Sequence, residues 1–295
     1  MRFLRPKKPP ILLCADFDET ITQRDTTALL FHLASSPVSL QHQLITQYES
    51  EAGAFRGSYE LKWRSGRNVR SDFDDAGLRE FLEGYATTDL RSLQRVVECR
   101  ALRGICRPGI VAAAGQVELR ADCVETLGTV DEWKVISANW SEELVRLVLQ
   151  SAGVETQATQ IIANELRMDE RGVSTGEIEV EVQTPVDKAR WVTELRETSG
   201  EKKVVYVGDS ANDLLALLEA DVGVWLASDA ASSSSRLLQR LVDNYGIDVH
   251  PLTSYESFVE CATQRGAGDR PVLFTTTDWS QLRTLVQAHR QNERT

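Results

Sequence analysis

Four short apolar segments, rich in β-branched residues, are each followed by polar turn residues and then by apolar positions at helical spacing. They lie at residues 11–18, 133–139, 202–210 and 221–227, and residues 271–276 are a fifth strand candidate. Apolar strands that alternate with helices are typical of a parallel sheet with both faces covered. We therefore predict an α/β core built on a parallel sheet.

Residues 26–107 follow a different pattern. They contain no convincing buried strand, and between residues 90 and 101 the apolar positions recur at helical spacing. The sheet-type pattern resumes after this stretch, with a helix predicted over residues 110–127. We expect an all-helical insertion at 26–107 within an α/β core formed by residues 1–25 and 108–295.

The composition is that of an acidic globular protein: of 295 residues, 42% are hydrophobic, and the formal net charge is −11. Such a charge argues against nucleic acid as a partner, because a phosphate backbone requires a basic face. No apolar run approaches the ~20 residues that cross a bilayer, and the run after the basic start is too short for a signal peptide. We expect a cytoplasmic protein with neither a membrane nor a nucleic-acid partner.

Polar side chains cluster just beyond the predicted strands. In a parallel sheet the carboxyl ends of the strands lie along one edge, where ligands bind. The residues concerned are Asp16, Asp18, Ser137, Asp209 and Asp213. This edge of the sheet is therefore the expected functional site.

Asp16 and Asp18 leave the first strand two residues apart, so both carboxylates can meet one substrate. Two acids at this spacing suit a division of labour, in which one attacks phosphorus and the other protonates the leaving oxygen and then activates water. The alternative is a turn with helix-capping acids.

The segment Gly208 to Asp213 follows the third strand. Gly208 permits a tight turn, and Asp209 offers the hard oxygen ligand that Mg²⁺ prefers. Ser210 and Asp213 are also spaced as a helix capping box, which is a purely structural alternative for Asp213. Both roles are compatible.

Ser137 and Lys188 are candidates for phosphate contacts. Asn139 and Glu142 are spaced as a helix N-cap pair, which places Ser137 at a helix N-terminus, a natural seat for phosphate. The helix expected to begin after Thr184 holds Lys188 in its first turn, where a cation opposes the macrodipole. A nearby anion explains a lysine there better than helix stability does.

In their order along the chain, which is Asp16 to Thr20, Ser137, Lys188 and Gly208 to Asp213, the four segments resemble the motif set of the haloacid dehalogenase (HAD) superfamily of phosphatases, over residues 11–20 and 108–227. The resemblance implies a Rossmann-like core with an inserted helical cap, Mg²⁺ as cofactor and an aspartyl-phosphate intermediate. It also implies roles for particular residues. Asp16 would be the nucleophile and Asp18 the general acid and base. The phosphate would be contacted by Ser137, Ala138, Asn139 and Lys188. The metal would be held by Asp16, Asp209 and the backbone carbonyl of Asp18, with Asp213 either a direct ligand or a support for the ligands.

The position of the insertion resembles the phosphoserine-phosphatase-like branch of this superfamily, as do the stretches 164–166 and 172–176. Asp25 stands where phosphoserine phosphatases carry a glutamate that reads the substrate amine, and its shorter side chain argues against phosphoserine. Residues 232–237, 246–252 and 272–279 resemble a plant phosphatase domain that hydrolyses thiamin monophosphate and fungal relatives, one of which acts on polyol phosphates.

We therefore predict a phosphomonoester hydrolase for a small phosphorylated metabolite, with thiamin monophosphate or a polyol or sugar phosphate favoured. The alternatives are a phosphoserine-type phosphatase, a phosphotransferase, a protein phosphatase, a dehalogenase and a catalytically silent protein that binds a phosphorylated ligand. The basic residues at 56–70 and 91–107 could draw in an anion, but most are expected on a solvated face. Tyr59 and Trp63 are expected to pack within the insertion.

Overall fold

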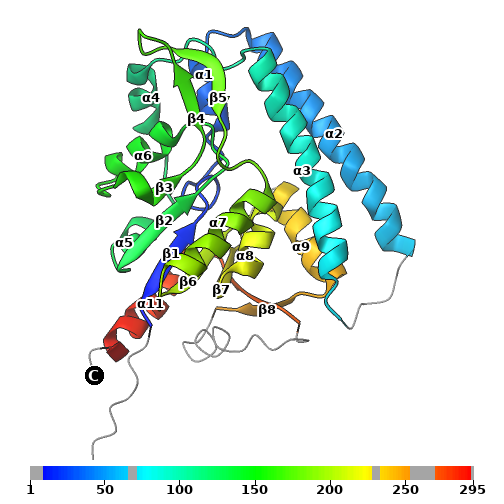
Figure 1. Cartoon of the computed structure of the whole chain (residues 1–295), viewed down its shortest axis with the longest axis vertical. Helices are drawn as coiled ribbons and strands as arrows, with labels where there is room; N and C mark the ends of the chain where they lie inside the picture. The colour runs from blue at the N-terminus through cyan, green and yellow to red at the C-terminus, as the bar shows by residue number, and fades with distance from the viewer. Residues whose placement is uncertain (1–8, 66–71, 228–232, 253–269, 294–295) are drawn as a thin grey trace, which may run out of the picture.

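The computed structural model describes residues 9–65, 72–227, 233–252 and 270–293 (Figure 1). The predicted features at residues 66–70 and at Ser232 lie outside these ranges. Among the described residues, no helix has both the length and the apolar character needed to cross a membrane.

One sheet of seven parallel strands forms the core, in the order β3-β2-β1-β6-β7-β9-β8. The strands are β1 (Ile11–Ala15), β2 (Glu132–Ile136), β3 (Ile161–Ile162), β6 (Lys203–Gly208), β7 (Val222–Leu226), β8 (Asp248–Pro251) and β9 (Val272–Thr276). All five predicted strands are present, and the predicted α/β class is confirmed.

Helices cover both faces of this sheet (Figure 1). Alternate residues of β1 point to opposite faces, as in any strand: Leu13 belongs to a buried cluster that includes residues of α4, α5, α6 and α11, whereas Leu12 belongs to one that includes residues of α7, α8 and α9. These helices are α4 (Arg107–Ala114), α5 (Cys123–Leu127), α6 (Glu142–Ser151), α7 (Pro185–Thr198), α8 (Leu214–Glu219), α9 (Ser233–Tyr245) and α11 (Trp279–Glu293). Burial on both faces explains why β1 is apolar throughout.

Between β1 and β2 the chain forms a helical cap of α1 (Thr27–Leu33), α2 (Val38–Ser65) and α3 (Asp75–Glu98). The helices α2 and α3 run side by side as a long arm beside the core (Figure 1). Tyr59 and Trp63 pack against Phe81, with ring centroids 4.8 and 5.4 Å away, as predicted. The base of α3 contacts α7 and α9, so the arm rests on the core.

The helix predicted over residues 110–127 is wrong, because α4 ends at Ala114 and α5 begins only at Cys123. In the middle of this stretch, Leu119 forms an antiparallel bridge with Thr22 of the loop that follows β1. The Gln23 amide donates to the Glu118 carbonyl, and the Arg120 amide donates to the Ile21 carbonyl, both at 2.9 Å. Gly115 caps the end of α4, and backbone pairing with a distant loop keeps the following residues out of a helix.

An antiparallel hairpin, β4 (Glu165–Met168) and β5 (Ser174–Glu179), was not predicted. Its residues are largely polar and half-exposed, so the apolar signal of a buried strand is missing. Two further strands were not predicted. The strand β3, which follows a 3₁₀ turn at Ala158–Gln160, has only two residues, and β8 has four residues, none of them fully buried.

Candidate active site

The strands β2, β1 and β6 are neighbours in the sheet, so the segments that follow them meet at one edge. Asp16 extends the ladder beyond β1, with its amide 2.9 Å from the Val207 carbonyl. The chain then turns out of the sheet just after Asp18, where Glu19 has a φ of 57°. The Trp279 indole holds this turn by donating to the Thr20 carbonyl at 3.0 Å.

Three buried carboxylates converge at this edge. Asp16, Asp209 and Asp213 each place one oxygen within 4.8 Å of the other two. The Lys188 ammonium lies 2.9 Å from Asp16 Oδ1 and 2.7 Å from Asp213 Oδ1. One lysine thus pairs with two of the three carboxylates, and the acids outnumber the cation in this cluster.

Lys188 reaches this cluster because of how α7 begins. Thr184 caps the helix in a reciprocal capping box with Asp187, and Pro185 occupies the first helical turn, as predicted. The Lys188 side chain is only 2% exposed. Burial lowers its pKa, but the carboxylates of Asp16 and Asp213 more than offset this and hold the pKa above its ordinary value. The anion expected near this lysine is therefore a pair of carboxylates.

Asp213 is saturated with hydrogen bonds. Its Oδ1 accepts from Lys188 and from the Tyr206 hydroxyl at 2.9 Å, and its Oδ2 accepts from the amide and hydroxyl of Ser210 at 3.1 and 2.9 Å. The predicted capping box is present. A Cβ at position 208 would lie 2.4 Å from Asp213 Cγ, so Gly208 is required for this close approach rather than for a turn.

The electrostatics of the cluster suit a cation. Burial raises the pKa of Asp16 to about 7, with Lys188 opposing the rise and Asp213 adding to it. Burial also raises the pKa of Asp209 well above its ordinary range, and Asp213 and Asp16 add to it. Converging carboxylate oxygens are the donor set that Mg²⁺ prefers, so the residues present fit the expected metal.

Asp18 stands apart from this cluster in a hydrogen-bonded pocket of its own. Its Oδ1 accepts from the amide and hydroxyl of Thr26 at 2.8 and 2.7 Å, and its Oδ2 accepts from Asn139 Nδ2 at 2.9 Å. Burial, reinforced by Asp25, raises the pKa of Asp18 to about 6 against these hydrogen bonds. The two acids of the first motif therefore occupy different environments.

The predicted N-cap at Asn139 is wrong, because α6 begins two residues later. Ser141 is the cap, with its hydroxyl accepting from the Leu144 amide at 3.1 Å. Asn139 is instead held by the Ser141 amide and turned toward Asp18. Ser137 is buried before this turn, and its hydroxyl accepts from the Asn139 amide at 3.1 Å.

A cavity of about 560 Å³ extends from Asp16, Asp18 and Asp209 toward the cap helices α2 and α3. This volume is within the usual range for small-molecule sites. The predicted residues Asp25, Ala138 and Asn139 line it as well. Asp25 is exposed at its rim, where its carboxylate accepts from the Thr27 amide at 2.6 Å. The lining residues without a role predicted from sequence include Tyr48, Tyr85, Asp89, Gln183 and Asn212.

Most of the site residues that were not predicted carry no signal in the sequence that connects them with the site. Thr20, within the first motif, donates to Asp209 Oδ1 at 3.0 Å, and its position could have pointed to this contact. Thr26 and Tyr206 contact acids from a loop and from a strand interior, and only the fold brings them there.

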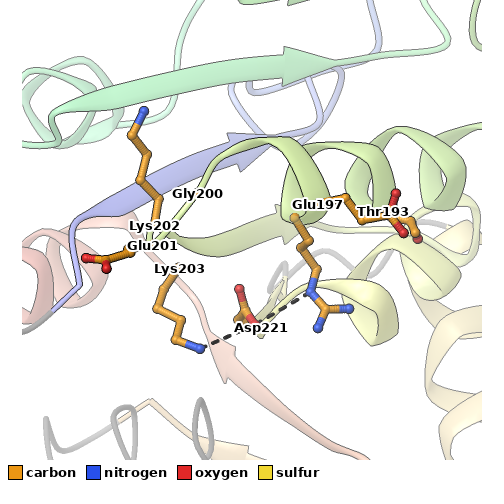
Figure 2. Close-up of a pocket in the computed structure, with 8 residues that line it drawn as sticks. Thr193, Glu197, Gly200, Glu201, Lys202, Lys203 and Asp221 are labelled. Carbon is orange, nitrogen blue, oxygen red and sulfur yellow. Dashed lines mark ion pairs between the residues drawn. The ribbon is translucent and has the colours of Figure 1, made fainter.

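A second pocket, of about 400 Å³, lies at the opposite, amino-terminal end of β6 and β7 (Figure 2). Asp221 is paired there with Arg196 and Lys203, at 3.5 and 3.7 Å. The charges are matched and the pocket is far from the acidic cluster along the strands. Its chemistry does not suggest a reaction.

A parallel sheet with buried carboxylates and a lysine at its carboxyl edge, beneath an inserted helical cap, is the arrangement of the HAD-type phosphatases. The model of the haloacid dehalogenase-like hydrolase family matches residues 13–218. The chain belongs to this family, and the family resemblance read from the motifs is confirmed.

Among curated proteins, the chain is 28% identical to the bifunctional TH2 protein, mitochondrial, of Arabidopsis thaliana, over 95% of this chain. It spans about half of that protein, 49% of its length. It is 21% identical to a CTO1 family protein of Schizosaccharomyces pombe, over 94% of this chain and 100% of that protein.

Two solved structures of phosphoserine phosphatase share the fold. One, with an analogue of the phospho-aspartyl intermediate, has a TM-score of 0.51 at 16% identity and covers 79% of this chain and 91% of its own. The other, with bound substrate, has a TM-score of 0.50 at 18% identity and covers 80% and 91%.

Proposed function

We propose that this hydrolase is a Mg²⁺-dependent phosphatase that removes phosphate from a small metabolite through an aspartyl-phosphate on Asp16. The observation that carries the proposal is the pairing of Asp16 with Lys188 and Asp209 at the floor of the cavity, while Asp18 is held separately beside it. A nucleophile and a separate proton donor are the two groups that this chemistry needs.

Asp16, Asp209 and the Asp18 carbonyl would hold the metal. Bound there, Mg²⁺ supplies positive charge that offsets the charge of the phosphoryl group during transfer. We assign Asp213 a supporting role instead of a ligand role, although its oxygen lies close enough, because both of its oxygens already accept two hydrogen bonds each.

The chain's own residues then divide the reaction. A carboxylate oxygen of Asp16 attacks phosphorus and forms an O–P bond, while the ester P–O bond breaks and Asp18 gives its proton to the leaving oxygen. Asp18 next takes a proton from water, whose oxygen attacks the phosphorus and releases phosphate from Asp16. Asn139 and Thr26 orient Asp18 for both steps.

The phosphate contacts are assigned to residues around the floor of the cavity. Ser137 and the backbone of Ala138 and Asn139 border it, and Lys188 lies next to Asp16. In the free protein Lys188 pairs with carboxylates, so phosphate would share this cation with Asp16 and Asp213. These groups would position the phosphoryl group in line with the nucleophile.

We assign residues 26–107 to the cap and residues 1–25 and 108–295 to the core. A cavity enclosed by cap helices suits a small metabolite, with thiamin monophosphate or a polyol or sugar phosphate as the favoured substrates, and it disfavours a protein substrate. A cytoplasmic location and the absence of nucleic-acid and membrane partners remain predictions; the Arabidopsis relative is named as mitochondrial.

The direct test of the proposed function is turnover of p-nitrophenyl phosphate by the purified protein. We expect hydrolysis that requires Mg²⁺, stops in excess EDTA and returns when Mg²⁺ is restored, because the carboxylate cluster repels the phosphate without a cation. Undiminished turnover in EDTA would contradict the metal assignment. A screen of phosphate monoesters under the same conditions would identify the substrate class.

Asp25 is proposed to contact a cationic or hydroxyl-bearing part of the substrate, since its exposed carboxylate stands at the rim of the cavity. We expect Asp25→Ala to lower kcat/KM for the physiological ester more than for p-nitrophenyl phosphate, by about 1–3 kcal/mol for a lost polar contact. If the two substrates lose equally, Asp25 serves only to hold the Thr27 amide at the start of α1.

A further inference from the structure

The cap half of the cavity contains a second carboxylate site, centred on Asp89 of α3. The Asp89 side chain is 5% exposed and borders the cavity. Its Oδ1 accepts a hydrogen bond from the Tyr48 hydroxyl of α2 at 3.0 Å. Its Oδ2 is buried and has no hydrogen-bond partner among the described residues.

A buried carboxylate oxygen without a partner is unfavourable for folding, because that oxygen loses its hydration and gains no hydrogen bond in return. Burial raises the pKa of Asp89 to about 7, with the Tyr48 hydrogen bond opposing the rise. An amide or an apolar side chain would serve the packing of α2 against α3 better. The carboxylate is therefore explained by a group that enters the cavity and is absent from the free protein.

The surroundings of Asp89 define what such a group is attached to. Tyr48 and Tyr85 line the cavity together with Asp89, and Leu44, Ala52 and Val96 form part of its apolar wall. Arg56 also borders the cavity, but it interacts with the Tyr85 hydroxyl. The walls beside Asp89 are mainly aromatic and aliphatic, and Glu49 and Ser92 also line the cavity. Apolar walls beside a buried acceptor suit a ring that bears a hydrogen-bond donor, whereas a polyol would leave hydroxyls against apolar surface.

We propose that Asp89 is a specificity-determining residue, which accepts a hydrogen bond from an amino or other donor group on a ring-bearing alcohol portion of the phosphate ester. The proposal rests on the proposed function, since it places the ester's phosphate at Asp16 and its alcohol portion in the cap. It deepens that function by favouring phosphate esters of ring-bearing alcohols with a hydrogen-bond donor over polyol phosphates.

The first test compares esters that separate the ring from the donor: thiamin monophosphate and 4-aminophenyl phosphate, phenyl phosphate, and glycerol 2-phosphate. The wild-type protein should prefer a donor-bearing ring ester to phenyl phosphate, and either to glycerol 2-phosphate. Asp89→Asn keeps the volume and the Tyr48 contact but can present an N–H where an acceptor stood. It should lower kcat/KM for the preferred ester roughly 10–100-fold more than for phenyl phosphate, mainly through KM.

The matched control is Glu83→Gln, which removes an exposed carboxylate from the same helix away from the cavity and should leave all the ratios unchanged. Absence of a wild-type preference for a donor-bearing ring ester, or equal losses on all esters with Asp89→Asn, would overturn the proposal.

Thermal stability distinguishes recognition from a structural role. We expect a melting temperature for Asp89→Asn no lower than that of the wild type, because the variant removes a buried carboxylate with one unsatisfied oxygen and keeps the contact with Tyr48. A marked decrease would mean that Asp89 stabilises the α2–α3 contact, and the proposal would fail.

Binding of the dephosphorylated alcohol, with thiamin as the probe, tests Asp89 without any turnover. Calorimetric titration should show binding to the wild type that weakens at least 10-fold in Asp89→Asn. If the wild-type protein hydrolyses no ester in the panel, the proposed function fails, whereas this measurement still supports or overturns the cap site on its own. Equal binding by the two proteins, or none by either, would overturn it.

Discussion

The variant Asp16→Asn is expected to lose phosphatase turnover by a factor of roughly 10³ or more while it keeps its fold. The amide matches the carboxylate in shape but cannot attack phosphorus. Folding should be preserved because Lys188 still pairs with Asp213, and the repulsion between Asp16 and the other two carboxylates disappears. Steady-state kinetics with p-nitrophenyl phosphate and a thermal melt measure the two effects separately.

The matched control for this substitution is Asp75→Asn, which changes an exposed carboxylate in a surface ion pair with Arg79. Such pairs contribute about 0–1 kcal/mol to stability, so neither turnover nor melting should change appreciably. A well-folded Asp16→Asn protein with substantial activity would refute the nucleophile.

The variant Asp18→Asn should differ in kind, because it impairs both protonation of the leaving oxygen and activation of water. Loss of general acid and base catalysis typically lowers turnover about 10²–10⁴-fold. With an aryl ester whose leaving group needs no proton, attack by Asp16 can still proceed while hydrolysis of the aspartyl-phosphate is slow. We expect intact mass spectrometry to detect one added phosphoryl group, which peptide mapping places on Asp16.

The double variant Asp16→Asn, Asp18→Asn is the control for this trapping experiment and should take up no phosphoryl group. The fold of the Asp18→Asn variant must be checked, because Asp18 Oδ2 accepts a hydrogen bond from Asn139 Nδ2. If the new amide places its own N–H at this position, it faces the N–H of Asn139 and the hydrogen bond is lost. A phosphoryl group on any other residue would mean that the assignment of the two acids is wrong.

Much of the core could be predicted from the sequence, because strands buried on both faces have a continuous apolar signal. The strand β1 is an example: all five of its residues are buried, and the polar residues that follow it mark where the chain leaves the sheet. Local helix signals were also sufficient at α7, where Thr184, Pro185 and Asp187 predict the first turn and with it the position of Lys188.

Where long-range contacts decide the structure, the local pattern was misleading. Gly115 directly after Ala114 is a local signal that α4 ends there, but the course of the chain from there to Cys123 is set by pairing with the loop after β1. Asn139 has the character of a cap but serves Asp18, which lies 121 positions away in the chain. Neither partner can be inferred from neighbouring residues.

The sequence by itself determined the class of the fold, the family and the edge of the sheet at which acids gather, because periodicity and motif order are properties of consecutive residues. Only the tertiary structure decided which acid is paired with a lysine, which has both oxygens satisfied and which keeps one buried oxygen without a hydrogen bond. Asp89 is the clearest case: it lies on a helix as one acid among many, and its meaning comes from the cavity wall that α2 and α3 build around it. Burial and partnership depend on what the fold brings alongside a residue, and for this cavity those groups come from distant parts of the chain.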